Sequence, residues 1–114
     1  MSSQLRVEKL QELIKQEVSQ MLLKEEIKDP RIGFVTVTEV EMASDLHSAK
    51  IFVSIMGSDE KIQESLKGLR SALGFVRREL GKRIRMRYIP TFSFELDTSL
   101  NYSEHIQKIL HEIN

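Results

Sequence analysis

Residues 64–80 read ESLKGLRSALGFVRREL and decide the fold, because the phase of their apolar residues changes in the middle. Ser58 can cap a helix before this stretch, and two acidic residues follow it, where the helix dipole favours them. A first helical stripe comprises Ile62, Leu66, Leu69 and Leu73, and a second comprises Val76, Leu80 and Ile84. A glycine inside a helix costs about 1 kcal/mol relative to alanine, so we expect a kink at Ala72 and Gly74 between two helices.

Upstream of this stretch, the sequence predicts one helix and two strands. An amphipathic helix ending before Pro30 is indicated by apolar residues at Leu10, Leu13, Ile14, Val18, Met21 and Leu22. Two runs rich in β-branched residues follow, at 34–40 and 50–55, with a short polar hairpin connection at 43–46. In the second run, Ala49, Ile51, Val53 and Ile55 share the core face. In the first run, Val35 and Val37 compete for that face with Phe34, Val40 and Met42.

Downstream of Pro90, the sequence predicts a third strand and a last helix. Phe92, Phe94 and Leu96 alternate with polar residues, as in a half-buried strand. The helix is indicated by Ile106, Ile109, Leu110 and Ile113, with Asn101 and Glu104 as a capping pair. We expect one α+β domain over residues 1–114, in which a three-stranded sheet has its helices packed on one face.

Most methionine and phenylalanine residues are expected in the core, namely Met21, Met42, Met56, Met86, Phe34, Phe75, Phe92 and Phe94. Phe52 falls on the strand face opposite Ile51, where it is either partly exposed or covered by the last helix.

The composition excludes several classes of protein. The chain of 114 residues has no cysteine, which excludes a disulfide scaffold and cysteine-ligated zinc. It has no apolar run near the roughly 20 residues that a membrane span needs, and its polar start is unlike a secretory signal. We therefore expect a soluble cytoplasmic protein.

Charge is balanced overall but is distributed unevenly. The 17 basic residues equal the 17 acidic ones, which argues against a nucleic-acid partner if the charge is evenly spread. Counted by position, the net charge is −4 over residues 1–66, +7 over 67–87 and −3 over 88–114. A stretch of one sign repels itself, so an anion-binding surface is favoured there over an ordinary solvated helix face.

The candidate RNA-binding residues are the eight cations of this stretch: Lys67, Arg70, Arg77, Arg78, Lys82, Arg83, Arg85 and Arg87. At 100° per residue, Arg77, Arg78, Lys82 and Arg85 are predicted on the outer face of the second helix. Arg83 lies at the edge of the apolar stripe, and Arg87 can already be past the helix.

Catalytic and metal-binding patterns are sparse. There is no Gly-x-Ser-x-Gly nucleophile motif, no phosphate-loop or dinucleotide glycine pattern, and no pair of histidines at ligand spacing. Asp45 and His47 could form an acid–base pair, but both are ordinary choices for a turn. We expect a protein without catalytic activity, metal or cofactor.

Several motifs, in their order and spacing, resemble the ribosome-binding factor A family. They are Arg6-Val7, Glu26 to Ile32, Asp45-Leu46 with Ala49 to Val53, Ala72-Leu73-Gly74, and Arg87 to Pro90 with Phe94 and Asp97. The resemblance covers essentially the whole chain. It implies a type II KH-like fold in which an Ala-x-Gly kink, here Ala72 and Gly74, replaces the usual Gly-x-x-Gly loop.

The same resemblance implies a non-catalytic assembly factor. Such a factor binds the small (30S) ribosomal subunit and its rRNA during late maturation and rRNA processing, with a part in cold adaptation. It also implies a monomer and, for release, a ribosome-associated GTPase. The alternative is a protein-interaction module whose basic face binds an acidic protein partner.

Overall fold

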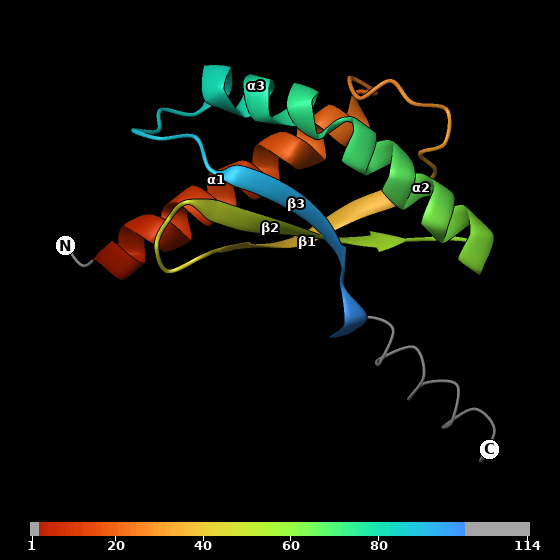
Figure 1. Cartoon of the computed structure of the whole chain (residues 1–114), viewed down its shortest axis with the longest axis horizontal. Helices are drawn as coiled ribbons and strands as arrows, with labels where there is room; N and C mark the ends of the chain where they lie inside the picture. Colours follow the sequence, from red (N-terminus) through yellow and green to blue (C-terminus); the bar gives the residue numbers. More distant parts are fainter. Residues whose placement is uncertain (1–2, 100–114) are drawn as a thin grey trace, which may run out of the picture.

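The computed structural model describes residues 3–99, which contain three helices and three strands (Figure 1). They are, in chain order, α1 Ser3–Leu23, β1 Val35–Met42, β2 Ser48–Ile55, α2 Asp59–Ser71, α3 Leu73–Arg83 and β3 Thr91–Leu96. The predicted α+β order is confirmed over these residues. The helix expected around Ile106 to Ile113 lies outside the described residues.

The three strands form one mixed sheet in the order β1-β2-β3. β1 pairs antiparallel with β2, with Val35 opposite Ile55, through the predicted hairpin connection. β2 pairs parallel with β3, with Ile51 opposite Phe94. A parallel pair requires a long crossover, and α2 and α3 supply it.

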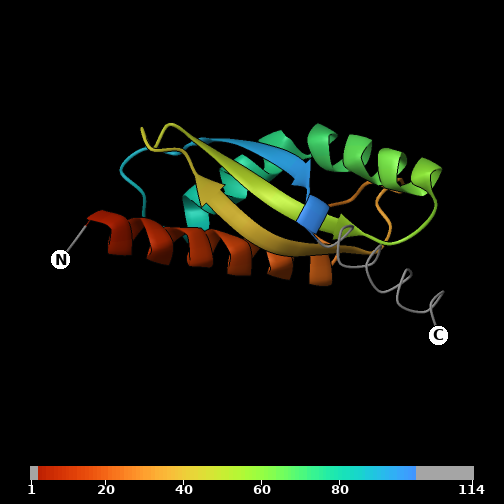
Figure 2. The same ribbon diagram turned by 90° about the horizontal axis from the view of Figure 1, so that it is seen from below.

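One face of the sheet is buried under all three helices, as predicted. On β2, Ala49, Ile51, Val53 and Ile55 are buried, and the residues between them are half-buried or exposed. These side chains form one core cluster with residues of each helix, namely Ile14, Val18 and Met21 of α1, Leu66 and Leu69 of α2, and Val76 and Leu80 of α3. Figure 2 shows α1 lying along the sheet beneath β1.

A β-bulge decides which residues of β1 face the core. The register with β2 shifts between Val37 and Glu39, so an extra residue enters β1 at Thr38. Val37, Val40 and Met42 are therefore all buried, although strict alternation cannot put Val37 and Val40 on one face.

Some apolar residues expected in the core are exposed. Phe34 comes just before β1 and is 82% exposed, and Met56 comes just after β2 and is 75% exposed, so both predictions are wrong. Leu13 belongs to the predicted apolar stripe of α1 but is 47% exposed. Phe75 and Met86 are half-buried against the core, and Phe52 is half-buried on the outer face.

The ends of α2 and α3 follow from local chemistry. The Ser58 hydroxyl accepts from the Lys61 N–H at 3.3 Å, which is the predicted N-cap of α2. α3 ends at Arg83, and Ile84 is extended with its side chain buried. The prediction that Arg85 lies on the outer face of this helix is therefore wrong, because burial of Ile84 turns the chain out of the helix before Arg85.

Candidate nucleic-acid interface

The helix break between α2 and α3 is a single residue. Ala72 has φ −90° and ψ 2°, and its N–H is shared between the carbonyls of Gly68 and Leu69, at 3.1 and 3.0 Å. The Val76 N–H then donates to the Ala72 carbonyl at 3.0 Å, which opens α3. The structure thus places the break at Ala72, and Gly74 in the first turn of α3.

The packing of the protein itself does not require a glycine at position 74. A Cβ on Gly74 would have the Arg78 Nη1 as its nearest neighbour, at an ordinary 3.7 Å. By contrast, a Cβ on Gly68 would lie 2.8 Å from Ile32 Cγ1, so the fold does require that glycine. The exposed backbone at Gly74 is therefore open to an approaching ligand.

The N-terminus of α3 is suited to an anion. Ala72 occupies the N-cap position and makes no side-chain capping bond, and the first turn contains no acidic residue. The positive end of the helix dipole therefore points at the break without a carboxylate to neutralise it. Arg78, whose guanidinium lies beside Gly74, adds a full positive charge next to this helix end.

Three of the eight candidate cations lie unpaired among the described residues. No hydrogen bond or ion pair within residues 3–99 engages the side chains of Lys67, Arg78 or Arg85, and all three are exposed. Lys67 and Arg78 lie opposite the buried stripes of their helices, so they point away from the core. Arg87 lies over the ring of Tyr88, 5.7 Å from its centroid.

Three other candidates bind neighbouring groups of the protein. Arg77 donates to the carbonyls of Ile89 and Pro90, at 3.0 and 3.2 Å, and so ties α3 to the loop before β3. Arg70 donates to the Phe94 carbonyl at 3.3 Å. Lys82 pairs with Glu79 at 3.4 Å and remains largely exposed.

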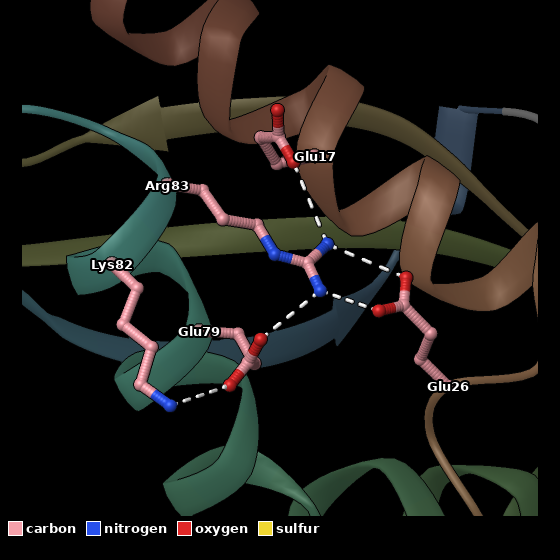
Figure 3. A network of polar contacts seen from close by, with 5 residues as sticks. All are labelled: Glu17, Glu26, Glu79, Lys82 and Arg83. Carbon is pink, nitrogen blue, oxygen red and sulfur yellow. Dashed lines mark hydrogen bonds and ion pairs between the residues drawn. The ribbon is translucent and has the colours of Figure 1, made fainter.

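Arg83 is held by three carboxylates from separate parts of the chain (Figure 3). Its guanidinium bonds Glu26 with both terminal nitrogens, lies 3.6 Å from Glu17 of α1, and is 3.0 Å from Glu79. The hydrogen bond from Arg83 lowers the pKa of Glu26, and the hydrogen bonds to Glu26 and Glu79 raise the pKa of Arg83. Arg83 therefore ties α3 to the end of α1, and its charge is already neutralised.

The loop before β1 is fastened beneath the helix break by groups that the sequence analysis did not identify. Ser65 is 1% exposed, and its hydroxyl accepts from the Gly33 N–H at 3.0 Å and donates to the Arg31 carbonyl at 3.2 Å. The Arg31 guanidinium reaches the Ser71 hydroxyl at 3.0 Å. The small residues Ser65, Gly68 and Ser71 recur every third position, and this spacing was the available signal of a docking face.

Arg31 itself is held by Asp29. Its Nε and Nη2 donate to the two carboxylate oxygens at 3.0 and 2.7 Å. The hydrogen bond from the Arg31 side chain, together with a smaller effect of the hydrogen bond from its backbone N–H, lowers the pKa of Asp29 to about 2. Arg31 therefore has a structural role in this turn.

Asp45 and His47 have the ordinary role of turn residues. The Asp45 carboxylate accepts from the backbone N–H of His47 at 3.0 Å, which shapes the hairpin connection. Across residues 3–99, no three acidic or histidine side chains gather closely enough to hold a metal ion.

Comparison with solved structures supports this fold. A crystal structure of ribosome-binding factor A from Thermus thermophilus has a TM-score of 0.67 and 24% identity, covering 79% of this chain and 94% of that one. A Thermus thermophilus homology model fitted into the cryo-EM map of a 30S–RbfA complex has a TM-score of 0.55 and 24% identity, covering 73% of this chain and 90% of that one. The fold defines a type II KH-like α+β protein with a broken helix pair.

Sequence relatives identify the family. The family model of ribosome-binding factor A matches residues 6–110. Ribosome-binding factor A of Natranaerobius thermophilus is 50% identical over 112 residues, which are 98% of this chain and 85% of that protein. The chain belongs to the ribosome-binding factor A family, as the resemblance implied, and membership of a family of ribosome-binding factors supports the prediction of a non-catalytic protein.

Within residues 3–99, no helix is both long and apolar enough to span a membrane.

Proposed function

We propose that this protein is a non-catalytic assembly factor that binds the immature small (30S) ribosomal subunit through its rRNA during late maturation. Family membership supports a ribosomal partner, and the Thermus thermophilus relative is associated with a 30S complex. A cytoplasmic monomer and release by a ribosome-associated GTPase are part of the proposal.

The main support for RNA binding is that the Arg78 guanidinium lies beside Gly74, in the first turn of α3. An RNA phosphate needs a close backbone approach, an N–H-rich helix end and a nearby cation, and these three features occur together at Ala72 to Arg78. KH-like modules bind a nucleic-acid backbone at the corresponding corner between two helices. We place the RNA backbone across this corner.

The eight candidate cations differ in whether another group of the protein already binds their side chains, and this difference decides the role that we assign to each. We assign direct phosphate contacts to Lys67, Arg78 and Arg85, because no group of the described chain competes for them. Arg70, Arg77, Lys82 and Arg87 lie in the same basic stretch and add to its field, although forming a phosphate contact would weaken their present interactions. Arg83 contributes to the shape of the corner rather than to RNA contact, because three carboxylates surround it.

Binding to naked small-subunit RNA tests the proposed class of partner. The protein is sedimented with immature small subunits and, separately, with protein-free small-subunit RNA. We expect co-sedimentation with both and a steep loss of binding as salt rises. Binding to subunits but not to free RNA would instead favour a protein partner for the basic face.

A further inference from the structure

The free edge of β1 borders an apolar groove. Within residues 3–99, β1 pairs with β2 alone, so its other edge is open. The groove lies between this edge, the end of α1 and the loop that joins them, and has a volume of about 830 Å³. Its apolar lining includes Leu22, Leu23, Phe34, Val35 and Val37, and polar residues such as Glu25 and Lys28 also line it.

Large apolar side chains stand exposed at one end of the groove. Leu23 is 78% exposed, and Phe34 is 82% exposed. Met56, which is 75% exposed, adjoins them, because its N–H donates to the Phe34 carbonyl at 3.1 Å. Clustered exposed apolar residues mark a surface that another element covers.

The residue that follows β3 contacts β1 close to this groove. The Asp97 N–H donates to the Val53 carbonyl at 2.9 Å, and the Asp97 carboxylate accepts from the Thr38 hydroxyl at 2.6 Å. The Asp97 side chain therefore reaches past β2 to Thr38 of β1, the residue next to Val37, which lines the groove. Asp97 also accepts from the Ser99 N–H at 2.9 Å, in the manner of a helix N-cap.

The fifteen residues after Ser99 carry a complementary pattern. At 100° per residue, one stripe about 100° wide holds Tyr102, Ile106, Ile109, Leu110 and Ile113, and the rest of the circumference is polar except for Leu100. Such a helix is stable only when its apolar stripe packs against another apolar surface.

We propose that residues 100–114 form an amphipathic helix that docks its apolar stripe in the groove beside β1 and covers Leu23 and Phe34. The outer face of the sheet is a poorer site, because Phe52 is surrounded there by polar neighbours such as Lys50, Ser54 and Glu95. The groove combines exposed large apolar side chains with a position close to the Asp97–Thr38 contact, at the end of the described chain. This docking is independent of the RNA-binding proposal.

A spin label on the polar side of the segment tests the docking. The chain has no cysteine, so Gln107→Cys gives a single attachment site in the full-length protein. We expect the amide signals of Leu23 and Phe34 to be attenuated more strongly than those of Lys50 and Phe52 on the outer face. Strongest attenuation at Lys50 and Phe52, or no selective attenuation, would overturn the proposal.

Two controls separate docking from other causes of attenuation. Ile109→Asp, in the apolar stripe, should abolish the attenuation at Leu23 and Phe34, whereas Lys108→Asp, on the polar side, should preserve it. The same attenuation in both variants would overturn the proposal. In a second control, spin-labelled chains are mixed with isotope-labelled chains that carry no spin label. Attenuation of Leu23 and Phe34 in the chains without a spin label, as strong as within one chain, would assign the groove to a second copy and overturn the proposal.

Discussion

The guanidinium of Arg78 lies beside the exposed backbone of Gly74, with its Nη1 3.7 Å from the position that a Cβ on Gly74 would occupy. Gly74 is the second residue of α3, two positions after the break at Ala72, and Arg78 lies one helical turn further on. Because the packing of the fold does not need a glycine at this position, we infer that Gly74 lets a ligand come close to the backbone.

Gly74→Ala separates stability from binding. Alanine favours a helix over glycine by up to about 1 kcal/mol, so the free energy of unfolding should stay unchanged or rise slightly. RNA affinity should fall roughly fivefold, because an added methyl group at the contact costs about 1 kcal/mol of interaction. Denaturant titration and an RNA-binding titration measure the two effects. Gly68→Ala is the matched control and should destabilise the protein, because its Cβ would collide with Ile32; unchanged RNA binding by Gly74→Ala would contradict the assignment.

Arg78→Ala should change the salt dependence of RNA binding. Each phosphate contact on single-stranded RNA contributes roughly 0.7 to the slope of log affinity against log salt. The slope should therefore become shallower by about that amount, which binding titrations at several salt concentrations measure. A uniform loss of affinity with the wild-type slope would mean that Arg78 does not contact a phosphate.

Arg83→Met should lower the melting temperature, because it leaves Glu17, Glu26 and Glu79 close together without their cation. The decrease should exceed that of Lys67→Met, whose side chain has no partner among the described residues. Thermal denaturation measures both. If the two variants melt alike, the carboxylate cluster does not stabilise the fold.

Ser65→Ala should destabilise the protein by about 1–3 kcal/mol, because it leaves the Gly33 N–H and the Arg31 carbonyl without their shared hydroxyl partner. Ser71→Ala, at an exposed position on the same face of α2, should cost less. Chemical denaturation ranks the two variants, and the reverse order would argue against a structural role for Ser65.

The stabilisation due to Asp29 should disappear in acid. Its pKa is lowered from 3.8 to about 2 in the folded protein, so its contribution is complete above about pH 4 and is lost as the pH falls through about 2. The pKa of Arg31 is raised instead, so its contribution stays constant over this range. The difference in melting temperature between wild type and Asp29→Asn should be full at pH 7 and shrink between pH 4 and pH 2. A difference that persists unchanged at pH 2 would contradict the Asp29–Arg31 pairing.

The sequence was sufficient to predict the order of the six described elements, and the core residues of β2 because they follow a regular apolar period. It could not predict the bulge at Thr38, because two-residue alternation has no place for an inserted residue and makes Val37 and Val40 alternatives for the core face. The sequence pattern includes Phe34 in the first strand, whereas β1 begins at Val35 and Phe34 is exposed just before it.

The candidate interface was predictable as a charged segment but not as individual contacts. Charge counting treats all eight cations alike, whereas Arg83 meets carboxylates from α1 and from the loop after it, more than 50 positions away. Arg77 likewise turns toward backbone carbonyls, which leave no trace in the composition. Such long-range partners become visible only when the chain is folded.

The affinity of a double charge reversal for protein-free small-subunit RNA tests the central claim most directly. Lys67→Glu combined with Arg78→Glu alters one exposed cation of α2, before the break, and one of α3, after it. Lys15→Glu combined with Lys50→Glu makes the same change of charge on α1 and β2. We predict that the first variant loses at least roughly a hundredfold in affinity, as expected for two phosphate contacts replaced by repulsion, while the control stays within a few-fold of wild type. Equal losses in the two variants, with both folded, would contradict an RNA interface at the helix break.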